Sequence, residues 1–244
     1  MCLLVVALMS CGGSATPPSP APADPAYVAE VEAWRAERLA RLTAEDGWLT
    51  LIGLHWLEPG PNAMGSAADC AVPLPADAAP EAVGTLTLRD DGTVWLEPAD
   101  GAGLTVNDEP ATARELATDA AGKPDRLAVG RLHFYLIARG ERIGVRVKDP
   151  EAGTRAHFAG IESYPVDPSW RVAARFEPYP EPRQVAIPTV LGTEDVMLAT
   201  GVLRFEAAGQ ELTLEPYLGA PDDEQFFLIF RDATSGVDTI RSSW

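Results

Sequence analysis

The sequence is poor in lysine, histidine and cysteine, and it has no long apolar run. Two of its 19 basic residues are lysines, Lys123 and Lys148, and the rest are arginines. They are outnumbered by 36 acidic residues, which give the 244-residue chain a formal net charge of −17. A chain of that charge is a poor general binder of nucleic acid or anionic membranes, so we expect no nucleic-acid partner. No apolar run approaches the ~18–20 residues that span a bilayer.

The sequence also lacks the short motifs that mark common catalytic and cofactor sites. It contains no HExxH, no GxSxG, no Walker loop, no GxGxxG and no CxxC pair. The acidic run Asp222, Asp223 and Glu224 lacks the spaced acids and the glycine of a calcium loop, and is interpreted as a solvated turn. We therefore expect no cofactor and no metal site.

The three histidines would have to converge in space to form a zinc or hydrolase site. His133 lies on the polar side of a predicted strand, where a surface role is simplest. His55 lies in an apolar run beside Trp56, which favours a hydrogen-bonded core histidine, although a ligand contact is also open. His157 follows in a loop, and as a general base it could pair with Asp149.

The N-terminus resembles a bacterial lipoprotein signal, with apolar residues 2–9 followed by Ser10, Cys11 and a Gly-Gly-Ser sequence. We predict a signal over residues 1–10 and lipidation of Cys11. An anchor and a disordered Pro/Ala/Ser tether would then cover residues 11–24. An ordinary secretory signal or a chance apolar stretch are the alternatives. The prediction places the chain in the cell envelope, anchored by lipid to a bacterial membrane and facing outside the cytoplasm.

This assignment leaves one cysteine in the folded part of the chain. Cys2 would leave with the signal and Cys11 would carry the lipid, so Cys70 would remain alone and no disulfide could form. A small buried apolar role is the simplest interpretation of Cys70. The folded part must then be stabilised by its core, for which ~220 residues suffice.

One long helix is predicted at the start of the folded part, over residues 25–46. Asp24 and Pro25 are typical of a helix N-terminus. Apolar residues then recur with a helical period at Val28, Val31 and Leu42.

The period changes to two after Gly47, which indicates strands. Alternating residues at 85–88 and 94–96 flank an Asp-Asp-Gly turn, and those at 132–137 and 143–147 flank a turn near 139–141. Later candidate strands are 170–176, 185–191, 202–205, 212–214 and 226–230, the last as a covered central strand. We predict a mainly β protein in which an N-terminal helix precedes two β modules, residues 47–149 and 150–244.

Several short motifs occur in an order that resembles an uncharacterised bacterial domain-of-unknown-function family, number 1684 in that series. They lie at residues 47–57, 60–65, 139–149, 158–160, 170–172 and 230–236. The resemblance covers residues 30–238 and implies no particular activity. Members continue past the last motif with further polar segments, whereas this chain ends at Trp244, so we expect a second module that is incomplete at its C-terminus.

Residues 65–147 resemble a forkhead-associated-type β-sandwich in the rhythm of their strands. The Gly-Arg and Ser-x-x-His elements by which that fold holds phosphothreonine have no match at residues 64–66 or 81–86. The resemblance therefore implies a fold and not phosphopeptide binding.

A basic strand is the best candidate for a ligand-binding surface. Arg142, Arg146 and Lys148 alternate along one strand face with Gly144 between them, and Arg139 lies at the adjacent turn. Guanidinium groups bind carboxylate or phosphate in a bidentate manner. The simpler interpretation is that these cations pair with the chain's own carboxylates. The full set of candidate ligand-binding residues is Arg139, Arg142, Arg146, Asp149, His55 and Trp56.

These observations favour an exported lipoprotein that acts as an envelope-associated binding module for a small-molecule or envelope ligand. The alternative is an extracytoplasmic, hydrolase-like enzyme whose site spans residues 139–149 and a C-terminal segment that the chain lacks. A structural envelope protein, or the product of a decayed gene, is the third possibility.

Overall fold

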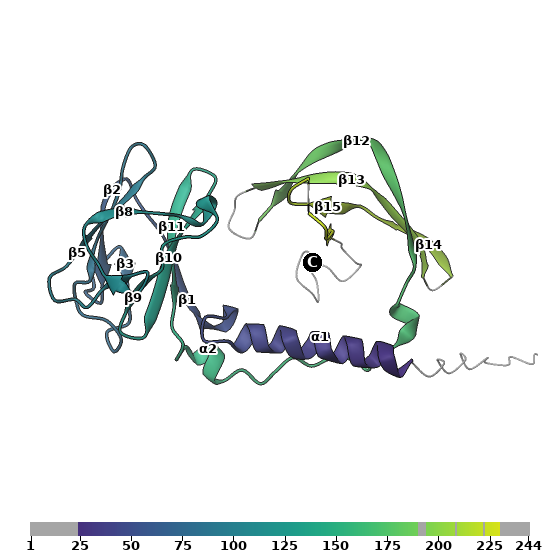
Figure 1. Cartoon of the computed structure of the whole chain (residues 1–244), viewed down its shortest axis with the longest axis horizontal. Coiled ribbons are helices and arrows are strands. Elements are labelled where there is room, and N and C mark those ends of the chain that lie inside the picture. Colours follow the sequence, from purple (N-terminus) through teal and green to yellow (C-terminus); the bar gives the residue numbers. More distant parts are fainter. Residues whose placement is uncertain (1–23, 190–193, 208, 222, 230–244) are drawn as a thin grey trace, which may run out of the picture.

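The computed structural model describes residues 24–189, 194–207, 209–221 and 223–229. It is mainly β, with an N-terminal helix followed by three sheets (Figure 1), which confirms the predicted fold class. The predicted signal, the Cys11 lipidation site and nearly all of the tether lie outside the described residues. Among the described helices, none is long and apolar enough to cross a membrane.

Helix α1 (Pro25–Thr43) begins as the sequence predicts. The Asp24 carboxylate accepts a hydrogen bond from the backbone N–H of Ala26 at 2.9 Å, and Pro25 occupies the first turn. The helix ends three residues before the predicted boundary. The chain turns there so tightly that a Cβ at Gly47 would lie 2.5 Å from the carbonyl oxygen of Arg41. No residue of α1 is buried.

The first β module consists of two sheets that face each other (Figure 1). The six-stranded sheet contains, in spatial order, β1 (Leu51–Trp56), β11 (Arg142–Lys148), β10 (Leu132–Arg139), β9 (Leu127–Val129), β6 (Thr105–Val106) and β7 (Glu109–Pro110). The five-stranded sheet contains β3 (Val72–Pro73), β2 (Gly60–Gly65), β4 (Gly84–Leu88), β5 (Val94–Pro98) and β8 (Arg114–Leu116). Both predicted hairpins, β4–β5 and β10–β11, are confirmed. The forkhead-associated-type arrangement stays a prediction.

The core lies between these two sheets. Phe134 and Val145 of the six-stranded sheet face Met64, Leu86 and Leu96 of the other, and each is at most 1% exposed. Alternate residues of β10 and β11 point into this core, as expected for strands with one buried face. The residues between them therefore occupy the outward face of the six-stranded sheet.

A connecting segment runs from residue 149 to residue 173 and contains α2 (Gly153–Ala156) and the 3-10 helix η3 (Pro168–Trp170). It lies along α1, because the guanidinium of Arg35 donates to the carbonyl of Tyr164 at 2.9 Å and that of Arg171 lies 4.9 Å from the Tyr27 ring centre. The predicted strand at 170–176 is wrong in its first half: the Asp167 side chain accepts from the Ser169 N–H and caps a helical turn through Trp170.

The second β module is a curved sheet of five strands (Figure 1): β12 (Ala174–Pro188), β13 (Glu194–Ala207), β14 (Gln210–Leu214), β15 (Pro216–Leu218) and β16 (Phe227–Leu228). The predicted strands at 170–176 and 185–191 are joined over residues 174–188 in one long strand, β12, which bends where the register shifts between Pro178 and Arg183, and residues 190 and 191 lie outside the described residues. Of the predicted covered central strand at 226–230, the described residues form the two-residue strand β16, and residue 230 lies outside them. β16 pairs with β15 alone among the described strands, and Phe226 is 45% exposed.

Candidate functional site

The predicted basic strand lies on the outward face of the six-stranded sheet. Arg146 of β11 pairs with Tyr135 of β10 on one side and with Leu54 of β1 on the other, and Gly144 pairs with Trp56. Because paired residues share a face, these side chains lie on the side opposite the buried Val145. The sequence prediction that Arg142, Arg146 and Lys148 share a face agrees with this register.

Gly144 makes room for an indole ring on this face. A Cβ at position 144 would lie 3.0 Å from Cε3 of Trp56 and 3.0 Å from Cδ1 of Leu54, so the Trp56 ring rests directly on the strand. The guanidinium carbon of Arg142 lies 4.0 Å from the centre of that ring. A cation so placed is attracted by the negative face of the aromatic ring. The sequence therefore builds a layered stack from strand backbone, indole and guanidinium.

Two further cations contact aromatic rings beside this stack. The guanidinium of Arg146 lies 5.3 Å from the ring centre of Trp48, in the 3-10 helix η1 (Trp48–Thr50), and donates to the hydroxyl of Tyr135 at 3.4 Å. The ammonium of Lys148 lies 5.6 Å from the Tyr135 ring centre and donates to the carbonyl of Asp46. We name the six residues Trp48, Trp56, Tyr135, Arg142, Arg146 and Lys148 the cation–aromatic face.

The three cations of this face carry charge that no carboxylate neutralises within the described part of the chain: none forms an ion pair with a described residue. Arg139 differs, because its Nη1 lies 2.8 Å from Oδ2 of Asp119. Pairing with the chain's own carboxylates, the simpler interpretation of the sequence, thus fits Arg139 and does not fit the other three. Arg139 is engaged at the edge of the site.

His55 and Asp149 lie apart from the cation–aromatic face. His55 pairs with Val145, whose side chain points into the core, and both His55 and Asp149 line a hollow of about 490 Å³ at the edge of the sandwich. Burial lowers the pKa of His55 below its ordinary value, so the ring is neutral at pH 7. The structure therefore divides the candidate residues between two places.

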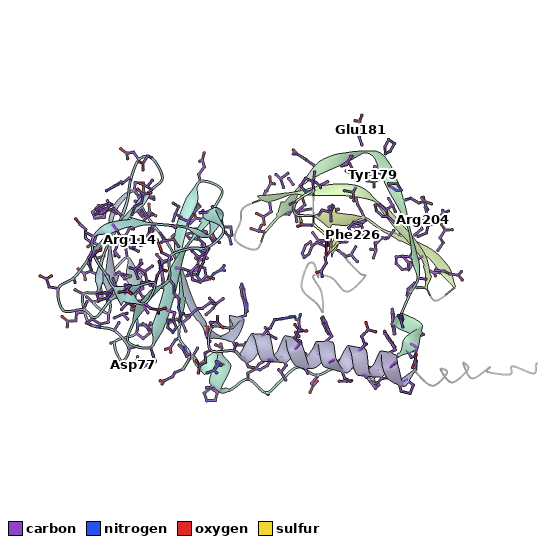
Figure 2. The ribbon with its side chains drawn as sticks, viewed as in Figure 1. Asp77, Arg114, Tyr179, Glu181, Arg204 and Phe226 are labelled. Atoms are coloured by element: carbon purple, nitrogen blue, oxygen red, sulfur yellow. The ribbon has the colours of Figure 1, made fainter. Side chains whose placement is uncertain are left out.

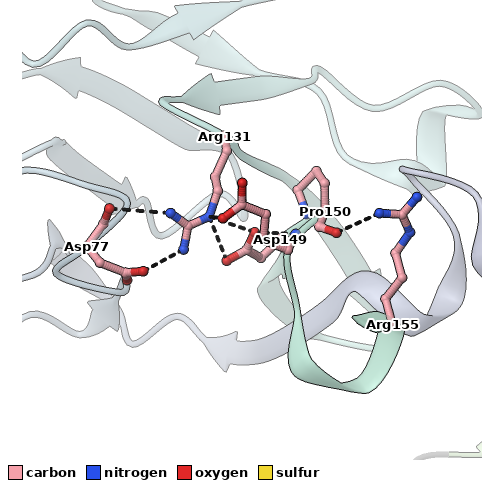
Figure 3. Close-up of polar contacts among 6 residues, drawn as sticks. Asp77, Arg131, Asp149, Pro150 and Arg155 are labelled. Atoms are coloured by element: carbon pink, nitrogen blue, oxygen red, sulfur yellow. Dashed lines mark hydrogen bonds and ion pairs between the residues drawn. The ribbon is translucent and has the colours of Figure 1, made fainter. Parts of the chain in front are cut away.

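Asp149 belongs to an ion-pair network centred on Arg131, which also pairs with Asp77 and Glu151 (Figure 3). Nε of Arg131 donates to the two carboxylate oxygens of Asp149 at 2.9 and 3.1 Å, and the N–H of Glu151 donates to one of them at 2.8 Å. Arg131 also donates to the carboxylate of Asp77 at 2.8 Å, and this hydrogen bond together with the charge of Arg131 lowers the pKa of Asp77. Asp149 is only 5% exposed, and these hydrogen bonds hold its carboxylate in place.

The other reactive groups that the sequence offered are occupied or unreactive. His157 does not pair with Asp149; its Nδ1 lies 2.9 Å from the carbonyl oxygen of Gly153. Cys70 is a free thiol, and burial, with the charge of Asp69, raises its pKa, which disfavours the nucleophilic thiolate. Asp223 accepts the N–H of Ala220 in a turn, as predicted for the acidic run, and Asp222 lies outside the described residues.

A polar cluster in the curved sheet was missed by the sequence reasoning. Glu215 accepts hydrogen bonds from the hydroxyls of Tyr179 at 2.6 Å and Tyr217 at 3.0 Å, and it also binds Arg183. Burial alone would raise the pKa of Glu215, but these hydrogen bonds hold it below its ordinary value. Figure 2 shows Tyr179 near the crest of the curve, where the strand register shifts. The cluster braces that bend.

The comparison with known families concerns this second module. Residues 156–243 match a family model described as "Protein of unknown function (DUF1684)". The DUF1684 match covers most of the connecting segment and the curved sheet, and it supports the resemblance expected from the sequence over that range. The cation–aromatic face lies in the sandwich, before the DUF1684 segment. A search of curated proteins gives no match.

Proposed function

We propose that this chain is an exported, lipid-anchored protein of the cell envelope whose sandwich binds anionic ligands through the cation–aromatic face. The observation that carries the proposal is a set of three cations that form no ion pair with any described carboxylate, on one face of a chain with a net charge of −17. A carboxylate or phosphate group would supply that partner, and guanidinium groups bind both through paired hydrogen bonds.

The aromatic rings prepare these cations for a ligand. A guanidinium stacked on a ring has lost part of its conformational freedom, so less entropy is lost when an anion binds. The stacking leaves the N–H groups at the guanidinium edge available to an acceptor. Arg142 is exposed to solvent, so an anion can reach it without a change of fold.

Binding fits the described residues better than the hydrolase-like alternative does. The sequence offered His157 as a general base that pairs with Asp149. In the structure, Asp149 is held by Arg131 and His157 contacts a backbone carbonyl. A general base must reach the proton that it removes, and Asp149 is enclosed by its own hydrogen-bond donors.

Anion binding is tested by titrating the full-length protein with sodium pyrophosphate and with galacturonate while tryptophan fluorescence is recorded, since Trp48 and Trp56 belong to the proposed site. The double variant Arg142→Gln, Arg146→Gln should lose at least ten-fold in affinity. The matched control is Arg175→Gln, Arg204→Gln, which removes the same charge from a face where both arginines pair with Glu177. Equal losses in the two double variants, or no binding by the wild type, would overturn the proposal.

The envelope assignment has its own test. Growth with a fatty-acid analogue should label the wild-type protein, and the label should disappear in Cys11→Ala. Cys70→Ala is the matched control and should keep the label. An unlabelled wild type would refute the anchor and leave the anion-binding proposal intact.

A further inference from the structure

We infer that the ligand of the cation–aromatic face is an extended acidic glycan, a chain of sugar rings bearing carboxylate or phosphate groups, which lies along β11. This inference rests on the proposed anion-binding function and names the class of ligand. It follows from the spacing of the cationic residues along the strand, from the aromatic rings beside them and from the exposure of the face.

The residues that carry the cations are spread along more of the strand than one small anion covers. Residues along a strand are separated by about 3.3 Å, so the backbone positions of Arg142 and Arg146 in β11 lie about 13 Å apart and the row from Arg142 to Lys148 extends about 20 Å along the backbone. A single carboxylate or phosphate can contact one of these cations or one adjacent pair. A ligand that engages the whole row must carry several anionic groups along its length.

Each cation of this row lies against an aromatic ring. Arg142 covers the Trp56 ring, which rests on the strand at Gly144, while Arg146 lies near Trp48 and Lys148 near Tyr135. Trp48 is 62% exposed, so its ring is accessible to a ligand. Sugar rings present C–H groups that carry a slight positive charge, and the negative face of an aromatic ring attracts such groups. Cations and an exposed ring therefore lie side by side here, as anionic groups and sugar rings do in an acidic glycan.

The face is exposed to solvent at Arg142 and Trp48. None of its six residues lines the hollows around His55, around Cys70 or beside Trp34. A small ligand needs a pocket that buries most of its surface, whereas a polymer gathers its affinity along an exposed face. Single-stranded nucleic acid stacks successive bases on successive exposed rings, whereas Trp48 is the one exposed ring of this face and Trp56 is covered by Arg142.

The test compares defined oligogalacturonates, from monomer to hexamer, by calorimetry on the full-length protein. We expect the hexamer to bind at least ten-fold more tightly than the dimer, and its methyl ester, which lacks the charges, to lose at least ten-fold. A sugar-phosphate oligomer of equal length separates a preference for phosphate from one for carboxylate. An affinity independent of length would overturn the inference and leave anion binding standing, whereas absence of binding by any anion would overturn both. An oligothymidylate that binds as tightly as the best glycan oligomer would replace the glycan with nucleic acid.

The rings have a separate test with a matched control. Trp48→Ala should weaken binding of the hexamer about five-fold or more, and it should weaken binding of pyrophosphate by less, because pyrophosphate has no sugar ring to stack on the indole. Trp34→Ala removes an indole of similar exposure, 55%, that also contacts an arginine, Arg38, with the guanidinium 5.7 Å from its ring centre. Because Trp34 lies on α1, outside the face, its removal should leave both affinities unchanged. Equal effects of the two variants would refute the role of the rings.

Discussion

Replacing Asp149 by asparagine should destabilise the sandwich substantially. The substitution preserves the shape of the side chain but removes its charge, and it replaces one of the two oxygens that accept from Nε of Arg131 with an amide that cannot accept. Arg131 would then retain Asp77 as its close carboxylate partner, and Asp77 is mostly exposed. The network would lose its only buried member among the described residues.

The size of the effect follows from burial. Removing one partner of a buried ion pair costs about 3–5 kcal/mol. Asp149 satisfies that condition at 5% exposure, but the Arg131 side chain is 27% exposed, so water can solvate part of its charge. The N–H of Glu151 can still donate to the remaining oxygen. We therefore expect a loss of about 2–3 kcal/mol in the free energy of unfolding.

Urea denaturation followed by tryptophan fluorescence measures this loss, which should lower the transition midpoint by about 1 M for a domain of this size. The matched control is Glu151→Gln, because Glu151 also lies near Arg131, at 3.4 Å, but its side chain is 73% exposed. An exposed pair contributes about 0–1 kcal/mol, so the control should hardly shift the midpoint. If both variants unfold at the same urea concentration, burial does not determine the strength of this network and the reasoning fails.

Three further predictions concern other buried polar groups. Asn62→Ala should cost about 2–3 kcal/mol in urea unfolding, because its side chain is 1% exposed and forms two hydrogen bonds with the backbone of Glu58; a loss below about 0.5 kcal/mol would contradict it. The lowered pKa of Glu215 stabilises the folded state above about pH 4.3, and this contribution is lost as the pH falls through the lower folded-state pKa. The melting temperature should therefore fall with pH in this range, and Glu215→Gln should make the fall less steep. An unchanged slope in the variant would contradict this prediction. The lowered pKa of His55 makes the stability of the folded state rise with pH until about pH 6.5. His55→Gln should remove this rise, and identical pH profiles for the wild type and the variant would contradict the prediction.

Local patterns predicted the sandwich well. The alternation at 132–137 and 143–147 fixed which residues of β10 and β11 face the core, and it placed Arg142 and Arg146 on one face with Gly144 between them. A period of two is enough for this because a strand side chain has only two directions. The contact of Trp48 with Arg146 could not be inferred from the alternation, because Trp48 lies in η1, outside the strands.

Contacts between residues far apart in the sequence could not be predicted from local patterns. Nothing in the local pattern joins Arg131 to Asp77 or Tyr179 to Glu215, since each pair meets only after the strands have paired. The predicted strands at 170–176 and 185–191 leave the prolines at 178, 180 and 182 between them, and proline cannot donate in a ladder. In the structure, the segment that holds them forms the bulge of one continuous strand, a position where proline is tolerated.

The absence of any buried residue in α1 has a consequence for local unfolding of the protein. A helix of 19 residues without a buried face draws its stability from its N-cap, its side-chain pairs and a few contacts with the connecting segment. Its amide hydrogens should exchange with solvent through local opening, at a far smaller free energy than those of the sandwich strands. A protease would therefore cut within α1 while the three sheets remain folded, and unfolding of the chain would proceed in separate steps.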